Sequence, residues 1–175
     1  GSVQLLREAH ARGVKVSAEV CPHHFTLSDE AVTSYDANTK MNPPLRSNED
    51  VEALRKALKD NTINCIATDH APHSIDEKNC ECDKAAFGIV GLETALALGV
   101  TTLVEGGYLT PMELIEKMTI NPANVLGIEK GDISVGKTAD IAIVDADTLY
   151  NIDVKSFKSK GKNTPFDGYE VKGKV

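Results

Sequence analysis

The stretch INCIATDHAPH, residues 63–73, decides the expected fold of this chain. It opens with a short apolar run and then places an aspartate, two histidines and a proline within a few positions. That order predicts a buried strand, residues 63–68, that ends in a polar loop. In α/β folds the chemistry lies at the C-terminal ends of the strands. Asp69 is therefore a candidate metal ligand or proton carrier, and the alternative is that its carboxylate only caps the loop behind it.

The segments upstream of this stretch alternate between helix and strand patterns. Apolar spacing predicts a helix over 3–12, stopped by Gly13, and β-branched residues predict a strand over 14–20. Ser47 begins a capping signal for a helix over 49–59, which leads into the strand at 63–68. This alternation is typical of an α/β layer or barrel.

Downstream, a charged loop over about 69–90 has the length of an active-site lid, and helices are predicted from Gly91 to Leu98 and from Pro111 to Met118. After Gly127 the pattern changes to strands and turns, with a strand expected over 139–145. The expected division is therefore 1–127 and 128–175. The tail from Lys155 is expected to be a solvated strand pair.

Composition excludes several classes of function. A net charge of -7 with dispersed lysines argues against a nucleic-acid partner. No apolar run approaches the roughly 18 residues of a membrane span, so a cytoplasmic protein without membrane contact is expected. Four cysteines give no disulfide framework, and the pair Cys80 and Cys82 leaves a soft-metal site open as an alternative.

Five motifs in register carry a family resemblance. They are EVCPHH (19–24), KMNPPLR (40–46), TDHAPH (68–73), FGIVGLET (87–94) and GKTAD (136–140). In this order they resemble the C-terminal part of a class I dihydroorotase, a zinc-dependent amidohydrolase of pyrimidine biosynthesis. The resemblance implies an α/β fold: the last two strands and helices of a (β/α)8 metal-dependent hydrolase barrel (1–127), followed by part of a small β-sandwich (128–175).

The resemblance also implies a reaction and a set of residues. The reaction is the reversible cyclisation of N-carbamoyl-L-aspartate to dihydroorotate, in which a carboxylate moves a proton. Asp69 matches the strand-8 residue that ligates zinc and acts as general base and then acid. Asn42 and His73 match donors to the substrate, and the backbone of Phe87 and Gly88 matches a contact with the pyrimidine ring.

Each substrate residue has a simpler interpretation. Asn42 alone would suggest an Asx turn before two prolines, His73 a solvated loop residue and Phe87 a lid anchor. The doublet His23 and His24 is excluded from the metal ligands, because adjacent strand residues point to opposite faces and the family does not use the doublet.

The family's other metal ligands, which hold one or two zinc ions, are expected outside this chain. A catalytic zinc takes about three protein ligands, so the isolated chain is expected to be inactive, poorly metallated and prone to association through open strand edges. The parent enzyme is expected to bind its small substrate and to form either a homodimer or a complex with aspartate carbamoyltransferase.

Three alternatives stay open at this stage. One is a related cyclic amidohydrolase, namely dihydropyrimidinase or allantoinase, which shares the barrel and the GKxAD turn. Another is a non-catalytic dihydroorotase-like subunit that scaffolds aspartate carbamoyltransferase. The last is a piece with a purely structural role.

Overall fold

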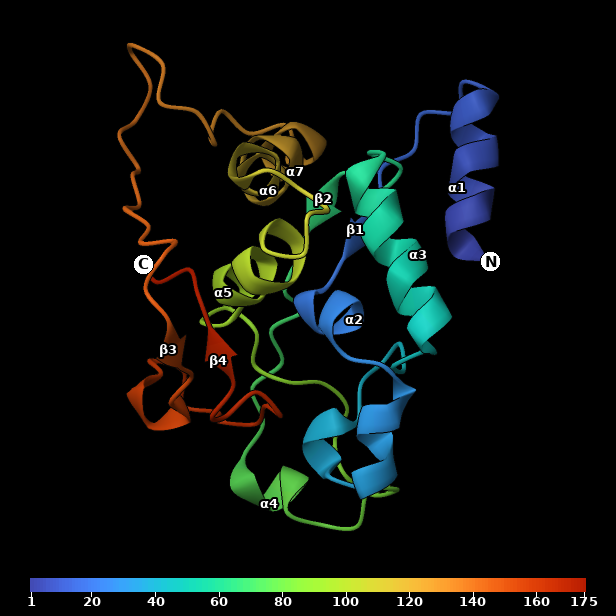
Figure 1. Cartoon of the computed structure of the whole chain (residues 1–175), viewed down its shortest axis with the longest axis vertical. Coiled ribbons are helices and arrows are strands. Elements are labelled where there is room, and N and C mark those ends of the chain that lie inside the picture. Colours follow the sequence, from blue (N-terminus) through green and yellow to red (C-terminus); the bar gives the residue numbers. More distant parts are fainter.

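The computed structural model describes residues 1–175, and a pair of short parallel strands lies at its centre (Figure 1). β1 (Glu19–Val20) pairs with β2 (Cys65–Ile66), with Glu19 opposite Cys65 and Val20 opposite Ile66. Both strands form where they were predicted, but regular pairing covers only two residues of each. Because Val14 and Val16 are exposed and face no further strand, the predicted stretch 14–18 stays irregular.

The chain forms seven helices. They are α1 (Ser2–Ala11), α2 (Pro22–Thr26), α3 (Asn48–Lys59), α4 (Ile75–Lys78), α5 (Ala95–Gly99), α6 (Pro111–Met118) and α7 (Ile120–Leu126). Of these, α6 and α7 contact β2. Short 3₁₀ turns cover Asp29–Ser34, Ala37–Thr39 and Val154–Ser156, and a π-helical turn over Val100–Val104 continues α5. The helix predicted from residue 91 therefore begins later, at Ala95, and runs further.

The helix boundaries follow from local capping. The Ser47 hydroxyl accepts a hydrogen bond from Asp50 N at 3.3 Å at the start of α3. At α6, the Thr110 hydroxyl accepts from Glu113 N, and the Glu113 carboxylate in turn accepts from Thr110 N at 2.7 Å. Since both start signals are read directly from the sequence, the predicted starts of α3 and α6 agree with the structure to within one residue.

One hydrophobic core lies between the strand pair and its neighbouring helices. Its buried members are Val20, Phe25, Ala57, Leu58, Ile63, Ile66, Val100, Leu103, Leu109 and Leu114. Phe25, Leu58 and Leu103 are fully buried. This core fixes the ends of β1 and β2, and therefore the start of the loop that contains Asp69.

The C-terminal residues complete a second core. β3 (Tyr150–Asn151) pairs antiparallel with β4 (Glu170–Val171). The buried members are Leu27, Met41, Leu45, Ile89, Ala97, Leu98, Ile152, Phe166 and Val171. The expectation of a solvated tail after residue 155 is wrong, because Phe166 and Val171 bury their side chains against residues from the first half of the chain.

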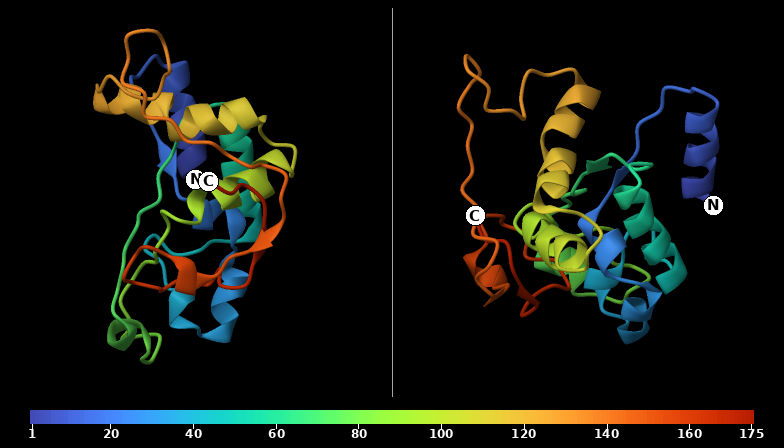
Figure 2. Two further views of the ribbon diagram at one scale, coloured as in Figure 1. Left: turned by 90° about the vertical axis from the view of Figure 1, so that its left-hand side faces the viewer. Right: turned by 45° about the horizontal axis from the view of Figure 1, so that its top comes forward.

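The segment between α7 and β3, residues 128–149, is extended, and both views of Figure 2 show it running outside the packed helices. Its apolar residues Ile133, Val135 and Ile143 are exposed. The strand predicted over 139–145 does not form, because only Asp145 finds a partner, in a single antiparallel bridge to Lys174. The division at residue 127 and the β-sandwich stay predictions.

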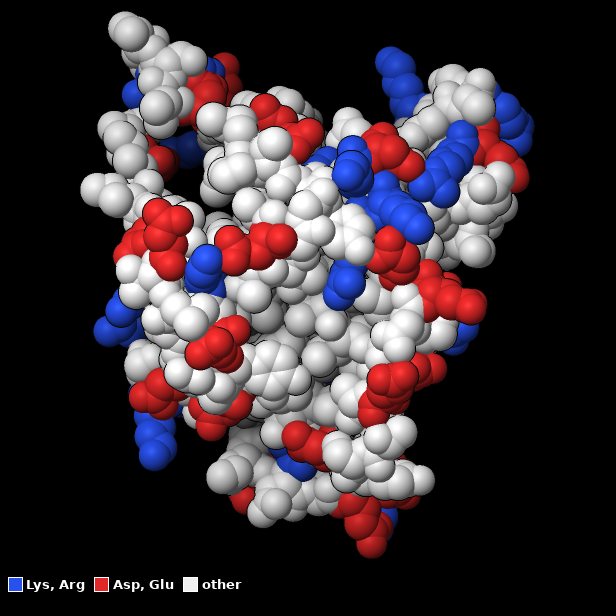
Figure 3. All heavy atoms as spheres, viewed as in Figure 1, with Lys and Arg blue, Asp and Glu red and all other residues white.

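The surface mixes both signs of charge. Figure 3 shows lysine and arginine side chains interspersed with aspartates and glutamates over the face in view. No helix combines the length and the apolar character that a membrane span requires.

Candidate functional site

The loop after β2 carries Asp69 in an unusual backbone conformation. Asp69 has φ of +49°, in the left-handed region that non-glycine residues seldom occupy, and its side chain is exposed. No hydrogen bond within the protein engages its carboxylate, so the loop-capping alternative is not what the structure contains. Such backbone strain is concentrated at functional sites. The carboxylate is left free to meet a ligand at the end of β2.

The loop then lies alongside a second segment, residues 87–91. His70 forms a parallel bridge with Ile89, and Ala71 N donates to Ile89 O at 2.8 Å. The ring Nδ1 of His70 accepts from the main-chain N of Gly91 at 3.1 Å. These contacts fix Asp69 beside the segment that contains Phe87 and Gly88.

His73 is held by both its ring and its backbone. Its Nε2 lies 2.9 Å from Phe87 O, and its main-chain N donates to Asn163 Oδ1 at 3.0 Å. Its Nδ1 lies 3.8 Å from Glu77 Oε2. The simpler interpretation as a freely solvated loop residue therefore does not hold. Because Nε2 is engaged with Phe87, Nδ1 is the ring atom left for a ligand.

Gly88 allows two segments to approach closely. It is buried, its φ is +97°, and a Cβ at this position would lie 2.7 Å from the Cβ of Ala71. Its N–H donates to Lys40 O at 2.9 Å, and its carbonyl accepts from Lys78 Nζ at 3.1 Å. Only glycine fits here without a shift of the backbone.

The segment that contains Asn42 joins the same group through Lys40. Lys40 Nζ donates to Asp83 O at 2.9 Å and lies 4.4 Å from the centroid of the Phe87 ring. The Asn42 side chain is exposed and makes no hydrogen bond, so an Asx turn does not form. The structure thus links the chain around Asn42, His73, Phe87 and Gly88, and places Asp69 next to them.

Two buried polar residues in this group were missed from the sequence. Asn163 is 6% exposed, and its amide nitrogen donates to Ala71 O at 2.9 Å and to Gly88 O at 3.2 Å. Lys78 is 7% exposed and also donates to Ala86 O at 2.8 Å, and burial lowers its pKa. Nothing in the single sequence marks Asn163, which lies 92 positions after Ala71.

The sequence contained a start signal for the helix that ends at Lys78. It ends α4, which begins with a reciprocal capping box between Ser74 and Glu77. The spacing Ser-x-x-Glu predicts such a start. The expected long loop 69–90 is therefore not structureless, because it contains this helical turn.

The doublet His23 and His24 does not lie on a strand, as the sequence analysis assumed. Both lie in α2 rather than on a strand, and their ring centroids are 4.3 Å apart. The alternation of strand faces therefore does not separate them.

Burial, and to a lesser extent the neighbouring His24, lowers the pKa of His23 to about 3. Burial, and to a lesser extent the charges of Asp69 and Glu19, raises the pKa of the Cys21 thiol to about 12.

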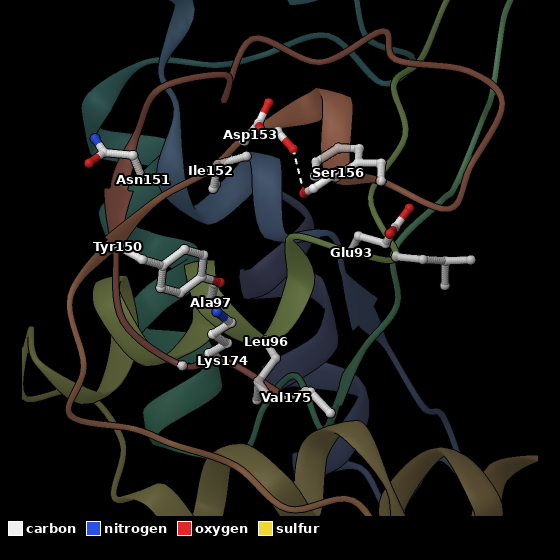
Figure 4. A pocket seen from close by; sticks show the side chains of 13 residues that line it. Glu93, Leu96, Ala97, Tyr150, Asn151, Ile152, Asp153, Ser156, Lys174 and Val175 are labelled. Atoms are coloured by element: carbon white, nitrogen blue, oxygen red, sulfur yellow. Dashed lines mark hydrogen bonds between the residues drawn. The ribbon is translucent and has the colours of Figure 1, made fainter.

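Apart from a cavity of about 570 Å³ beside Asn64 and Asn121, two cavities are large enough for a small ligand. One of about 620 Å³ is lined by polar side chains that include His73, Lys78, Lys162 and Asn163. The other, of about 580 Å³, lies between α5 and the C-terminal strands, and Figure 4 shows side chains from residues 93–97, 150–156 and 174–175 around it. None of the predicted site residues lines the second cavity. Of the predicted site residues, only His73 lines the first cavity, together with Lys78, Lys160 and Lys162.

The donor set at the end of β2 fits part of a metal site. An exposed, unpaired carboxylate at Asp69 is a suitable oxygen ligand for zinc. It supplies one ligand of the three that a catalytic zinc needs.

These features place the chain among α/β proteins whose functional groups stand at the carboxyl ends of parallel strands. The model of the amidohydrolase family matches residues 2–175, and the chain belongs to this family. The resemblance to dihydroorotases drawn from the five motifs is confirmed by curated relatives of that name.

The dihydroorotase of Pelotomaculum thermopropionicum is 60% identical over 173 residues, which are 99% of this chain and 40% of the relative. That of Thermoanaerobacter sp. (strain X514) is 58% identical over 175 residues, which are 100% of this chain and 40% of the relative. The L-hydantoinase (dihydropyrimidinase) from Arthrobacter aurescens superposes with a TM-score of 0.92 at 33% identity over 98% of this chain and 39% of that one. The chain thus spans about 40% of the length of the curated relatives it matches. Its fold is consistent with part of a barrel hydrolase.

Proposed function

We propose that the full-length protein carrying this chain is a dihydroorotase, which interconverts N-carbamoyl-L-aspartate and dihydroorotate in pyrimidine biosynthesis. One observation carries the proposal: the unpaired carboxylate of Asp69 stands beside three linked segments that hold Asn42, His73 and Gly88. The identity of 60% to a curated dihydroorotase supports the substrate.

Asp69 takes two roles in this proposal. It ligates a zinc ion whose remaining ligands come from residues outside this chain, in a centre of one or two ions. Zinc, when bound, polarises the substrate carbonyl and activates water. In each turnover the Asp69 carboxylate accepts a proton as general base and then returns it as general acid. Because no internal hydrogen bond holds this carboxylate, it does not have to break one to act.

Substrate binding falls to the neighbouring residues. The exposed Asn42 amide makes no internal hydrogen bond that would compete with a substrate carboxylate, whereas His73 Nδ1 lies 3.8 Å from Glu77 Oε2, which a substrate carboxylate has to displace. The carbonyl oxygens of Phe87 and Gly88 each accept internal hydrogen bonds, which fixes their direction. The Phe87 N–H, which has no backbone acceptor, is the main-chain donor that we assign to the ring of the substrate.

We also propose a cytoplasmic location and an inactive isolated chain. All four cysteines are free, as is common in reducing compartments. A single carboxylate ligand does not hold a catalytic zinc by itself. We also propose that the full-length protein forms a homodimer or a complex with aspartate carbamoyltransferase.

The test is turnover by the full-length zinc-loaded protein. We expect interconversion of N-carbamoyl-L-aspartate and dihydroorotate, and a loss of kcat of at least about 100-fold in Asp69→Asn. Asp76→Asn, which changes an exposed carboxylate in α4, serves as the matched control and should keep full activity.

Two outcomes would overturn the proposal. Faster turnover of dihydrouracil or hydantoin than of dihydroorotate would favour the related cyclic amidohydrolases, whose solved structures superpose on this chain. A zinc-loaded wild-type protein that turns over none of these substrates would favour the non-catalytic scaffolding subunit.

A further inference from the structure

Three side chains at the junction of β1 and α2 converge without a role in the proposed reaction. Cys21 follows the last residue of β1, and His23 and His24 lie in the first turns of α2. One ligand atom from each, the Cys21 Sγ and one nitrogen of each imidazole, lies within 4.8 Å of the other two.

We infer that Cys21, His23 and His24 form a binding site for a thiophilic metal ion of the zinc class. A thiolate with two imidazoles is a ligand set that zinc uses, with a fourth position left for water. Bond lengths of about 2.1 Å to nitrogen and about 2.3 Å to sulfur put tetrahedral ligand atoms about 3.5 Å apart. Binding therefore has to draw the ligand atoms together by at most about 1.3 Å.

His23 gives the first independent indication of a ligand. Its side chain is 97% buried, since its exposed fraction is 3%, yet neither ring nitrogen hydrogen-bonds to another group of the protein. Asn38 Oδ1 is the only buried side-chain nitrogen or oxygen without a partner, so the unbonded His23 nitrogens keep contact with solvent and can be reached by an ion.

His24 gives the second indication. Its Nε2 lies 2.8 Å from Pro43 O, and a carbonyl only accepts, so Nε2 carries the proton. The lone pair is therefore on Nδ1. Metal-binding histidines are typically oriented in this way, with the other ring nitrogen donating to a backbone carbonyl.

The surrounding charge favours a cation. Glu19 and Asp69 lie close enough to Cys21 for their negative charges to attract a metal ion to it. On binding, the Cys21 Sγ–H bond breaks, the proton leaves to solvent, and the sulfur lone pair forms the bond to the metal. No change of oxidation state is involved.

The test is Co²⁺ titration of the reduced chain, followed by displacement with Zn²⁺. We expect one equivalent of Co²⁺ to produce a thiolate-to-cobalt charge-transfer band that Zn²⁺ removes. Cys21→Ser should abolish the band, and His23→Gln should weaken Co²⁺ binding by at least about 100-fold. The matched controls Cys80→Ser and His10→Gln change exposed residues of the same types and should retain it.

A measurement on the wild-type chain tests the inference even if a variant fails to fold. In the wild-type chain, Zn²⁺ should protect Cys21 from alkylation and leave Cys80 reactive, as measured by peptide mass spectrometry. Equal alkylation of Cys21 with and without Zn²⁺ would overturn the site. So would a charge-transfer band that survives Cys21→Ser, because another of the free thiols would then bind the ion.

Discussion

Replacement of Gly88 by alanine tests whether the two segments of the site pack as closely as the structure shows. A Cβ there would stand 2.7 Å from the Cβ of Ala71, and the backbone has φ of +97°. Left-handed backbone costs a residue with a Cβ about 1–2 kcal/mol, and forcing a methyl group into a packed contact costs about 1–3 kcal/mol more. Gly88→Ala should therefore lower the free energy of unfolding by about 2–5 kcal/mol.

Gly107→Ala is the matched control. Gly107 has φ of +73°, but nothing lies within 4 Å of its added Cβ, so only the backbone cost of about 1–2 kcal/mol applies. Urea unfolding followed by circular dichroism measures both variants. With a denaturant slope of about 2 kcal/mol per M, the Gly88 variant should lose about 1.5 M in midpoint and the control about half of that. Equal losses in the two variants would refute the close approach of Gly88 to Ala71.

Three further predictions concern the residues that hold the site and the helices. Asn163→Ala removes three hydrogen bonds and leaves buried backbone groups unpaired, so urea unfolding should show a loss of about 2–4 kcal/mol; a loss below about 0.5 kcal/mol would contradict this role. Lys40→Met should speed amide exchange over residues 79–88, measured by hydrogen–deuterium exchange, whereas Lys84→Met, at an exposed position, should not. Thr110→Ala should cost about 1 kcal/mol at pH 7. Hydrogen bonds from Thr110 lower the pKa of the Glu113 carboxyl, so the stability they give is present above pH 4.5 and is lost as pH falls further. The cost of Thr110→Ala should therefore shrink in unfolding measurements at acid pH. A cost that stays constant with pH would show that the capping box is absent.

The sequence predicted the parts of the structure that local rules determine. Ser47 and Thr110 mark helix starts because a capping side chain bonds to its own helix. The apolar run before Asp69 also predicted a buried strand end, because its pattern lies within a few consecutive residues. The functional segments were recognised from their motifs and their order.

Contacts between distant residues were beyond such rules. Asn163 pairs with Ala71 and Gly88 only because the C-terminal tail folds back on the second core, and its own neighbours carry no sign of this. The strand geometry assumed for His23 and His24 was wrong, because the chain turns into α2 directly after β1.

The central claim is that the Asp69 carboxylate binds the metal in the full-length protein. A crystal structure with zinc located by its anomalous scattering measures the distance between the two directly. The account predicts an Asp69 oxygen about 2.0–2.2 Å from zinc, with Asn42 and His73 turned toward the same cavity. A fully ligated zinc centre with the Asp69 carboxylate turned away from it would contradict the account.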